Sequence, residues 1–132
     1  MICIIIYFCS SMKEDRLRLR FIINPHSGVN SKNPILDSIP MFIDGSKFQY
    51  EICFTEYAGH AEELARQAVE SMADAVVAVG GDGTVNEVAR ALIHTSTIFG
   101  IIPCGSGNGL ARHLHIPSDV KKAIEIINAY QV

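Results

Sequence analysis

Short apolar runs recur along the chain, and small or polar residues separate them. Four of these runs are rich in β-branched or aromatic residues, which is typical of strands. The predicted strands are Leu17–Ile23, Lys47–Thr55, Ala75–Val79 and Ile98–Ile102. The third run is entirely apolar, as expected of a strand that is buried on both faces of a sheet.

Helices are predicted between the strands and after the last one. The expected ranges are Asn33–Ile43, His60–Met72, Thr84–Ile93, Leu110–Leu114 and a final helix capped by Ser118. Pro40 argues against the first, because proline inside a helix removes a backbone donor. The second places Ala61, Leu64, Ala65, Ala68 and Met72 on one face, and the last turns Val120, Ala123, Ile124 and Ile127 inward. The alternation predicts an α/β fold, a doubly wound and mostly parallel sheet with helices on both faces.

The composition fits one globular domain. Of the 132 residues 48% are apolar, which is enough to fill a core of this size. We expect residues 17–132 to form the domain and residues 1–16 to be an extra N-terminal segment, because Met12 is a second candidate start. The net charge is −3 without a basic block, which argues against nucleic-acid binding. An anionic ligand would therefore need local contacts.

The cysteines indicate the cellular compartment in which we expect the protein. Cys3, Cys9, Cys53 and Cys104 are irregularly spaced and form no CxxC pair. A chain of this size folds without disulfides, so we expect reduced thiols in a cytoplasmic protein. The apolar stretch at residues 2–9 is too short to span a bilayer.

Polar loops rich in small residues follow the first, third and fourth predicted strands. Their sequences are Asn24-Pro25-His26-Ser27-Gly28, Gly80-Gly81-Asp82-Gly83-Thr84 and Pro103-Cys104-Gly105-Ser106-Gly107-Asn108. In a parallel sheet such loops meet at the carboxyl edge, where ligands bind. Glycines let backbone N–H groups approach phosphate oxygens, and helix N-termini add a positive dipole end. The three loops together predict a phosphate-binding cradle, although glycine after a strand also serves simple turns.

The familiar nucleotide-binding fingerprints do not explain this cradle. The chain contains no GxxxxGK[ST] motif, and Leu110 occupies the position where GxGxxG requires its third glycine. Asp82 is unexpected in a cradle, because a carboxylate buried among phosphate-binding amides would repel the ligand. It therefore suggests magnesium binding or base catalysis, with helix capping as the alternative. Glu87 is expected to orient the loop, and Asn86 and Glu87 also suit the start of a helix.

Four motifs in a fixed order strengthen the nucleotide hypothesis. They are NPHSG from Asn24, Thr55 with the later Gly59-His60-Ala61, GGDGTVNEV from Gly80, and PCGSGNGLARHL from Pro103. Together they resemble the catalytic domain of diacylglycerol kinases, a lipid-kinase family that includes sphingosine and ceramide kinases. GGDGT alone is shared with NAD kinases, but the attached NEV and the later GSGN favour the lipid-kinase branch. The resemblance extends from about Leu19 to Pro117.

The resemblance implies an N-terminal nucleotide-binding domain of NAD-kinase-like fold that binds ATP with Mg²⁺. Asp82 would handle the Mg²⁺ and phosphate or act as the general base. The implied ATP-binding residues are Asn24, Pro25, His26, Ser27, Gly28, Thr55, Gly80, Gly81, Asp82, Gly83, Thr84, Val85, Asn86, Glu87, Gly105, Ser106 and Asn108.

The function implied by the resemblance is transfer of the ATP γ-phosphoryl group to a lipid hydroxyl, as in diacylglycerol. Such an enzyme would work in the cytoplasm or at a membrane surface. In the family, a second domain of β-sandwich type supplies much of the lipid site and further metal ligands. It also supplies another carboxylate that is implicated in catalysis. That domain is not expected within the 132 residues. Activity of this chain alone is therefore doubtful on the resemblance.

Two alternatives remain open at this point. One is phosphorylation of NAD. The other is a shortened, non-catalytic ATP-binding module that associates with a partner or a second copy, forming a homo-oligomer through the face that the missing domain would cover.

Several reactive side chains are assigned ordinary roles. His113 and His115, two positions apart on a helix, point to different faces and suit the surface better than a metal site. His26 and His60 lie near the proposed cradle, where contact with phosphate and simple solvation are both open. Cys104 is expected to be a packed thiol rather than a nucleophile. Arg112 is the nearest cation to the third loop, and phosphate contact and a surface ion pair are equally open for it.

Overall fold

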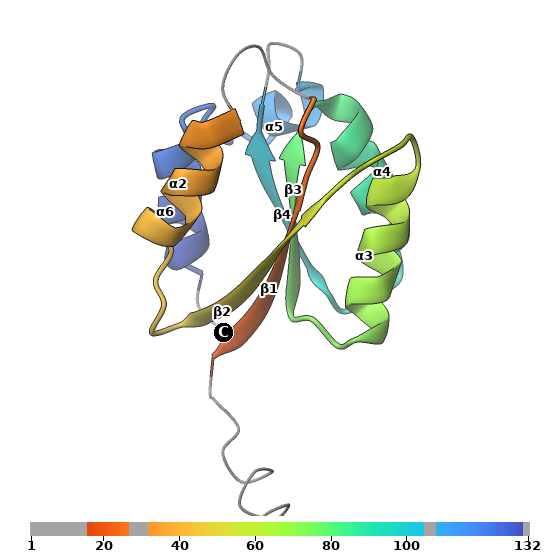
Figure 1. The fold of residues 1–132 in the computed structure, drawn as a ribbon, viewed down its shortest axis with the longest axis horizontal. Helices are drawn as coiled ribbons and strands as arrows, with labels where there is room; N and C mark the ends of the chain where they lie inside the picture. The colour runs from red at the N-terminus through yellow and green to blue at the C-terminus, as the bar shows by residue number, and fades with distance from the viewer. Residues whose placement is uncertain (1–15, 27–31, 105–107, 131–132) are drawn as a thin grey trace, which may run out of the picture.

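Four parallel strands form the centre of the protein (Figure 1). The computed structural model describes residues 16–26, 32–104 and 108–130. The strands are β1 (Leu17–Ile23), β2 (Phe48–Phe54), β3 (Ala75–Gly80) and β4 (Ile98–Pro103), in the order β2-β1-β3-β4. The chain thus starts at an inner strand, moves to one edge, and then crosses back to the other half of the sheet. Because right-handed crossovers in opposite directions place helices on opposite faces, this order confirms the doubly wound fold.

Helices cover both faces of the sheet (Figure 1). Helices α2 (Lys32–Phe42) and α6 (Val120–Asn128) pack on one face, around a core that includes Phe21, Val77 and Ile124. Helices α3 (His60–Glu70) and α4 (Asp82–Leu92) pack on the other, around Ile22, Val76 and Val88. All six residues of β3 are buried, as the continuous apolar run predicts for a strand covered on both sides.

The predicted strands and helices all occur, but several boundaries differ. Helix α2 forms with Pro40 inside it, so this proline does not prevent the helix. Helix α4 begins at Asp82 rather than Thr84. The short helix α5 spans Gly109–His113. The cap of α6 is Asp119 rather than Ser118, because the Asp119 carboxylate accepts the N–H of Lys122 at 2.9 Å.

The sequence periodicity predicted that Met72 lies on the buried face of α3, and this prediction is wrong. The helix ends before it, and Met72 has a φ of 60° and is 80% exposed. Its N–H donates to the Val69 carbonyl and that of Ala73 donates to the Ala68 carbonyl. This pair of bonds is the Schellman arrangement, in which the residue after the helix takes a left-handed conformation and leaves the helical face.

The same arrangement ends α5. His115 has a φ of 56°, and the N–H of Ile116 donates to the Ala111 carbonyl. His115 therefore lies beyond α5 and not on it, and both His113 and His115 are exposed. Within the described ranges, no helix is both long and apolar enough to cross a membrane.

Candidate functional site

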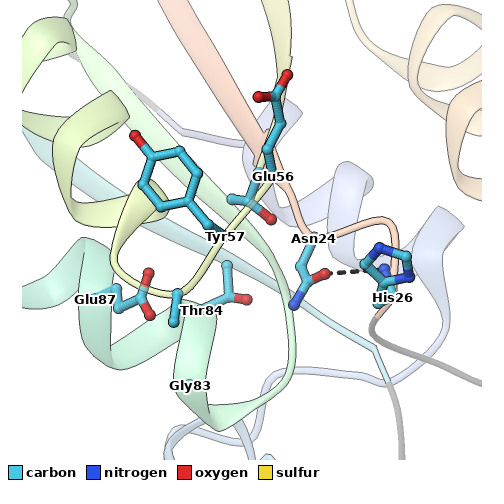
Figure 2. A pocket seen from close by; sticks show the side chains of 9 residues that line it. Asn24, His26, Glu56, Tyr57, Gly83, Thr84 and Glu87 are labelled. Atoms are coloured by element: carbon cyan, nitrogen blue, oxygen red, sulfur yellow. Dashed lines mark hydrogen bonds between the residues drawn. The ribbon is translucent and has the colours of Figure 1, made fainter.

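A cavity of about 310 Å³ opens at the carboxyl edge of the sheet, where β1, β2 and β3 end. Its volume is within the range of small-molecule pockets. Residues of the first loop, of the segment after β2 and of α4 line it: Asn24, His26, Thr55, Glu56, Tyr57, Ala58, Gly83, Thr84 and Glu87. Figure 2 shows Tyr57 on one side of Thr84, and Asn24 and His26 on the other. Of the three loops that were predicted to meet at this edge, the loops after β1 and β3 line the cavity.

The N-terminus of α4 contributes the positive end of a helix to this cavity. Gly81 has an extended conformation before the helix and offers no side-chain cap. The first N–H groups of a helix have no carbonyl partner within it, so those of this turn can receive an anion. Two residues of the turn, Gly83 and Thr84, line the cavity. This geometry suits a phosphate group.

Nothing in the described part of the structure requires glycine at position 83. A Cβ atom built on Gly83 would meet no other atom within 4 Å, so the position borders open space. Among the described glycines only Gly59 has a positive φ, and therefore neither Gly81 nor Gly83 needs glycine for a left-handed backbone. The expected sharp glycine turn is not what the described part of the second loop shows. The open space beside Gly83 does fit the other expectation, that glycine lets a ligand approach the backbone N–H groups.

Glu87 caps the N-terminus of the neighbouring helix α3. Its carboxylate accepts the N–H of Gly59 at 3.0 Å and the N–H of Ala61 at 3.2 Å. A carboxylate at this position satisfies donors that α3 cannot pair internally and also interacts favourably with the helix dipole. Glu87 was expected to orient the loop after β3, but its carboxylate fixes the loop after β2 instead. The first turn of α3 is consequently occupied by protein, whereas α4 has no such side-chain cap.

Asp82 is exposed, so the sequence expectation of a buried acid is wrong. The residue stands in the first turn of α4, and its Oδ1 accepts the N–H of Gly109 at 2.8 Å. That bond links the loop after β3 to the start of α5. In the described part of the chain, no three His, Cys, Asp or Glu side chains gather as a metal site. A metal ion at Asp82 would therefore rely on phosphate oxygens and water for most of its ligands, as Mg²⁺ in nucleotide sites does.

Asn108 holds the third loop against β3. Its Nδ2 donates to the Gly80 carbonyl at 3.2 Å, and its Oδ1 caps α5 by accepting the N–H of Ala111 at 3.1 Å. The side chain is buried. Gly80 is engaged twice, because its carbonyl also accepts the N–H of Cys104 at 3.0 Å. Gly80 and Asn108 thus join the two loops, and they do not line the cavity.

The first loop and the end of β2 are fixed by the sheet. The N–H of Asn24 donates to the Val79 carbonyl at 3.1 Å, and the N–H of Thr55 donates to the Ile23 carbonyl at 2.9 Å. The Asn24 Oδ1 accepts the N–H of His26 at 2.9 Å (Figure 2), which is an Asx turn. Thr55 is only 8% exposed, yet it lines the cavity. These contacts give the ligand site a rigid floor.

The remaining predicted site residues have varied positions. Val85 is fully buried in the core, so its side chain is directed away from a ligand. Asn86 is exposed and Pro25 is half-buried beside Asn24. Ser27, Gly28, Gly105 and Ser106 lie outside the described residues. Arg112 is exposed on α5.

Burial supports the expected roles of the thiols. Cys53 and Cys104 are both free cysteines and half-buried. Burial raises the pKa of Cys104 to about 11, so its thiol is protonated at neutral pH. A protonated, packed thiol is a poor nucleophile, in agreement with the prediction.

The sequence reasoning did not identify Tyr57, which lines the cavity. Its ring stacks on His60, with centroids 4.4 Å apart and planes 9° from parallel. Its hydroxyl donates to Glu63 Oε2 at 2.6 Å, and this bond is the main reason that the pKa of Tyr57 is raised. His60 is engaged as well, because its Nδ1 accepts the N–H of Glu56. The available signal was an aromatic residue two positions after Thr55, in the segment between a predicted strand and a predicted helix.

Comparison with known proteins is consistent with this geometry. The sequence family described as the diacylglycerol kinase catalytic domain matches residues 18–132. The diacylglycerol kinase of Staphylococcus epidermidis is 36% identical over 114 residues, which are 85% of this chain and 36% of the relative. That of Staphylococcus saprophyticus is 35% identical, over 85% of this chain and 37% of the relative. The chain thus spans little more than a third of the length of these relatives.

Solved structures show the same fold. The crystal structure of a diacylglycerol kinase from Bacillus anthracis superposes with a TM-score of 0.71 at 26% identity, and the match covers 84% of this chain and 38% of that one. A second structure from the same bacterium gives a TM-score of 0.74 at 25% identity, over 89% and 40% of the two chains.

Proposed function

Because the chain belongs to the diacylglycerol kinase catalytic domain family, we propose that it forms the ATP-binding part of a lipid kinase. The proposed reaction transfers the γ-phosphoryl group of ATP to the hydroxyl of a diacylglycerol-like lipid at a membrane surface. Residues 17–132 are the proposed nucleotide-binding domain. In this proposal the lipid site belongs mostly to sequence that the relatives have in addition to the matched part. The matched family and the relatives named above are diacylglycerol kinases, so we do not retain the NAD kinase alternative.

The observation that carries the proposal is the start of α4 at the cavity. Its first turn has backbone donors and a helix dipole, and Gly83 leaves open space next to them. Phosphoryl transfer depends chiefly on holding the phosphates in position and offsetting their charge. We propose that the triphosphate binds at this turn, in the cavity that Asn24 and Thr55 also line.

The charges around the cavity support a nucleotide that arrives with its metal ion. Glu56 and Glu87 are among the nine lining residues, and these include neither lysine nor arginine. A free triphosphate would meet two carboxylates there without a lysine or arginine side chain among these residues. Mg²⁺ would supply positive charge that neutralises the phosphates. Asp82 is the proposed protein ligand, and its exposed carboxylate at the start of α4 fits that role.

Asp82 also suits a second chemical role. A carboxylate can accept the proton of the attacking hydroxyl in phosphoryl transfer. Its hydrogen bond from Gly109 uses Oδ1 and fixes the side chain at the helix start. We propose that Asp82 orients the metal-bound phosphates or takes up this proton.

Two measurements test the proposed function. Isothermal titration calorimetry with MgATP measures nucleotide binding, and radiolabelled ATP with diacylglycerol in mixed micelles measures transfer. We expect saturable MgATP binding that Asp82→Ala weakens. NAD serves as the competing phosphoryl acceptor. Absence of MgATP binding by the unchanged protein would contradict the proposal, and labelling of NAD in preference to the lipid would contradict the assigned substrate class.

A further inference from the structure

We propose that Tyr57 is a binding residue on which the base of the nucleotide stacks. This inference rests on the proposed function, because it assumes that the cavity binds a nucleotide. It concerns the end of the ligand opposite the phosphates, for which the four motifs of the sequence give no residue.

The Tyr57 ring is held in place by two neighbours. One face of the ring is covered by His60 at a centroid distance of 4.4 Å. The hydroxyl is tied to Glu63 by a 2.6 Å hydrogen bond. A ring with these two restraints loses little conformational freedom when a ligand binds, and such preorganisation favours affinity.

The loop that bears Tyr57 is anchored at both ends. Before it, the N–H of Thr55 joins β1 through the Ile23 carbonyl. After it, Glu87 accepts the N–H groups of Gly59 and Ala61. Glu87 belongs to α4. The helix whose N-terminus borders the cavity therefore also fixes the loop that contains Tyr57. The separation of the two proposed subsites is therefore set by one helix.

Tyr57 is 53% exposed although it lines the cavity and has its hydroxyl bonded. Half of an aromatic side chain thus remains accessible to a ligand or to solvent. Nucleic-acid bases stack readily on aromatic side chains whatever the identity of the base. Tyr57 and the Gly83–Thr84 turn are both walls of the same cavity, as a ligand with an aromatic end and an anionic end requires (Figure 2).

Binding of MgATP and of magnesium tripolyphosphate, measured by calorimetry, tests this inference. Tripolyphosphate has the phosphates without the base. We expect Tyr57→Ala to weaken MgATP binding about tenfold, as loss of one stacking partner does. Tripolyphosphate binding should stay within about twofold in the same variant, because the α4 turn is untouched. Tyr57→Phe keeps the ring and loses only the bond to Glu63, so its MgATP affinity should lie much closer to that of the unchanged protein than to that of Tyr57→Ala, and its tripolyphosphate binding should be unchanged.

The controls separate stacking from a structural role. Tyr130→Ala removes another exposed tyrosine, which is not among the lining residues of this cavity, and should change neither ligand. Tyr57→Leu keeps apolar bulk without the aromatic ring, and it replaces Tyr57→Ala if that variant does not fold by circular dichroism. Equal weakening of both ligands, or no effect on MgATP, would overturn the inference. Failure of the unchanged protein to bind MgATP would overturn the proposed function and the inference with it.

Discussion

The carboxylate of Asp82 accepts the backbone N–H of Gly109 at 2.8 Å, and this bond connects the start of α4 with the start of α5. Asp82 follows β3 and Gly109 follows β4, so the bond links the ends of two adjacent strands at the carboxyl edge of the sheet. The residue proposed to handle the phosphates is thus held in place by the neighbouring loop segment. A structural and a chemical role for Asp82 need to be separated.

Asp82→Asn separates the two roles. The amide keeps an oxygen that can accept the N–H of Gly109, but it loses the negative charge and the basicity. We expect a loss of stability no larger than the ~0.3–1 kcal/mol that a negative charge contributes at a helix N-terminus, and a loss of phosphoryl transfer of at least ~100-fold, the scale of a lost general base. The rate of lipid phosphorylation by the protein measures this. Asp37→Asn, an exposed change on α2, is the matched control. Near-normal transfer in Asp82→Asn would show that the hydrogen bond is the residue's main contribution.

Gly83→Ala should make the protein slightly more stable and a poorer binder of MgATP. The added methyl group meets no protein atom within 4 Å, and the residue lies in the first turn of a helix with no positive φ. Replacing glycine by alanine at such a position stabilises a protein by ~0.4–1 kcal/mol. The methyl group occupies space that we assign to phosphate, so affinity should fall. Urea unfolding and calorimetry give the two quantities.

Gly45→Ala is the control for Gly83→Ala. Gly45 is an exposed turn residue whose added Cβ would also meet nothing within 4 Å, and it does not line the cavity. This variant should keep its MgATP affinity. Unchanged affinity in Gly83→Ala as well would mean that the ligand does not approach the first turn of α4.

Local patterns predicted the strands well because each strand is a short run rich in β-branched or aromatic residues. The all-apolar segment of β3, for example, needs burial on both faces whatever its neighbours are. The helix boundaries were harder to predict, since they depend on backbone choices such as the left-handed conformation of Met72. Periodicity placed Met72 on the buried face of α3, but the Schellman bonds end the helix before it.

The candidate site was likewise predicted from the sequence only in part. The loops at the carboxyl edge follow from strand order in parallel sheets, and Asn24, Thr55 and Gly83 are indeed walls of one cavity. The partner of Glu87 did not follow from the sequence, because Gly59 is 28 positions away and the contact depends on how α3 packs beside α4. The exposure of Asp82 was missed for a related reason, since α4 starts two residues earlier than its apolar pattern indicates.

Removing Glu87 should destabilise the protein through the helix that it caps. Glu87→Ala leaves the N–H groups of Gly59 and Ala61 without their carboxylate partner. Loss of an acceptor for partly buried donors costs about 1–3 kcal/mol of the free energy of unfolding. Glu87→Gln keeps one acceptor oxygen and loses the charge, so we expect a smaller loss. Urea unfolding of both variants measures their free energies of unfolding and shows which variant loses more.

Glu125→Ala provides the comparison for Glu87, because Glu125 is an exposed residue of α6. It should change the free energy of unfolding by no more than ~0.5 kcal/mol, as is usual for surface positions. A loss in Glu87→Ala no larger than that in Glu125→Ala would contradict the capping role.

The thiol of Cys104 should make the stability of the protein fall at alkaline pH. Burial raises the pKa of Cys104 from 9.0 to about 11 in the folded protein. Between these values the unfolded chain releases the thiol proton and the folded chain retains it, so unfolding is favoured as the pH rises. The stabilisation is fully present below pH 9.0 and is lost as the pH rises through about 11. Cys104→Ala lacks this titration, and its unfolding free energy should decline less between these two pH values than that of the unchanged protein. Equal declines, measured by urea unfolding at matched ionic strength, would show that the thiol is not buried in solution as it is in this structure.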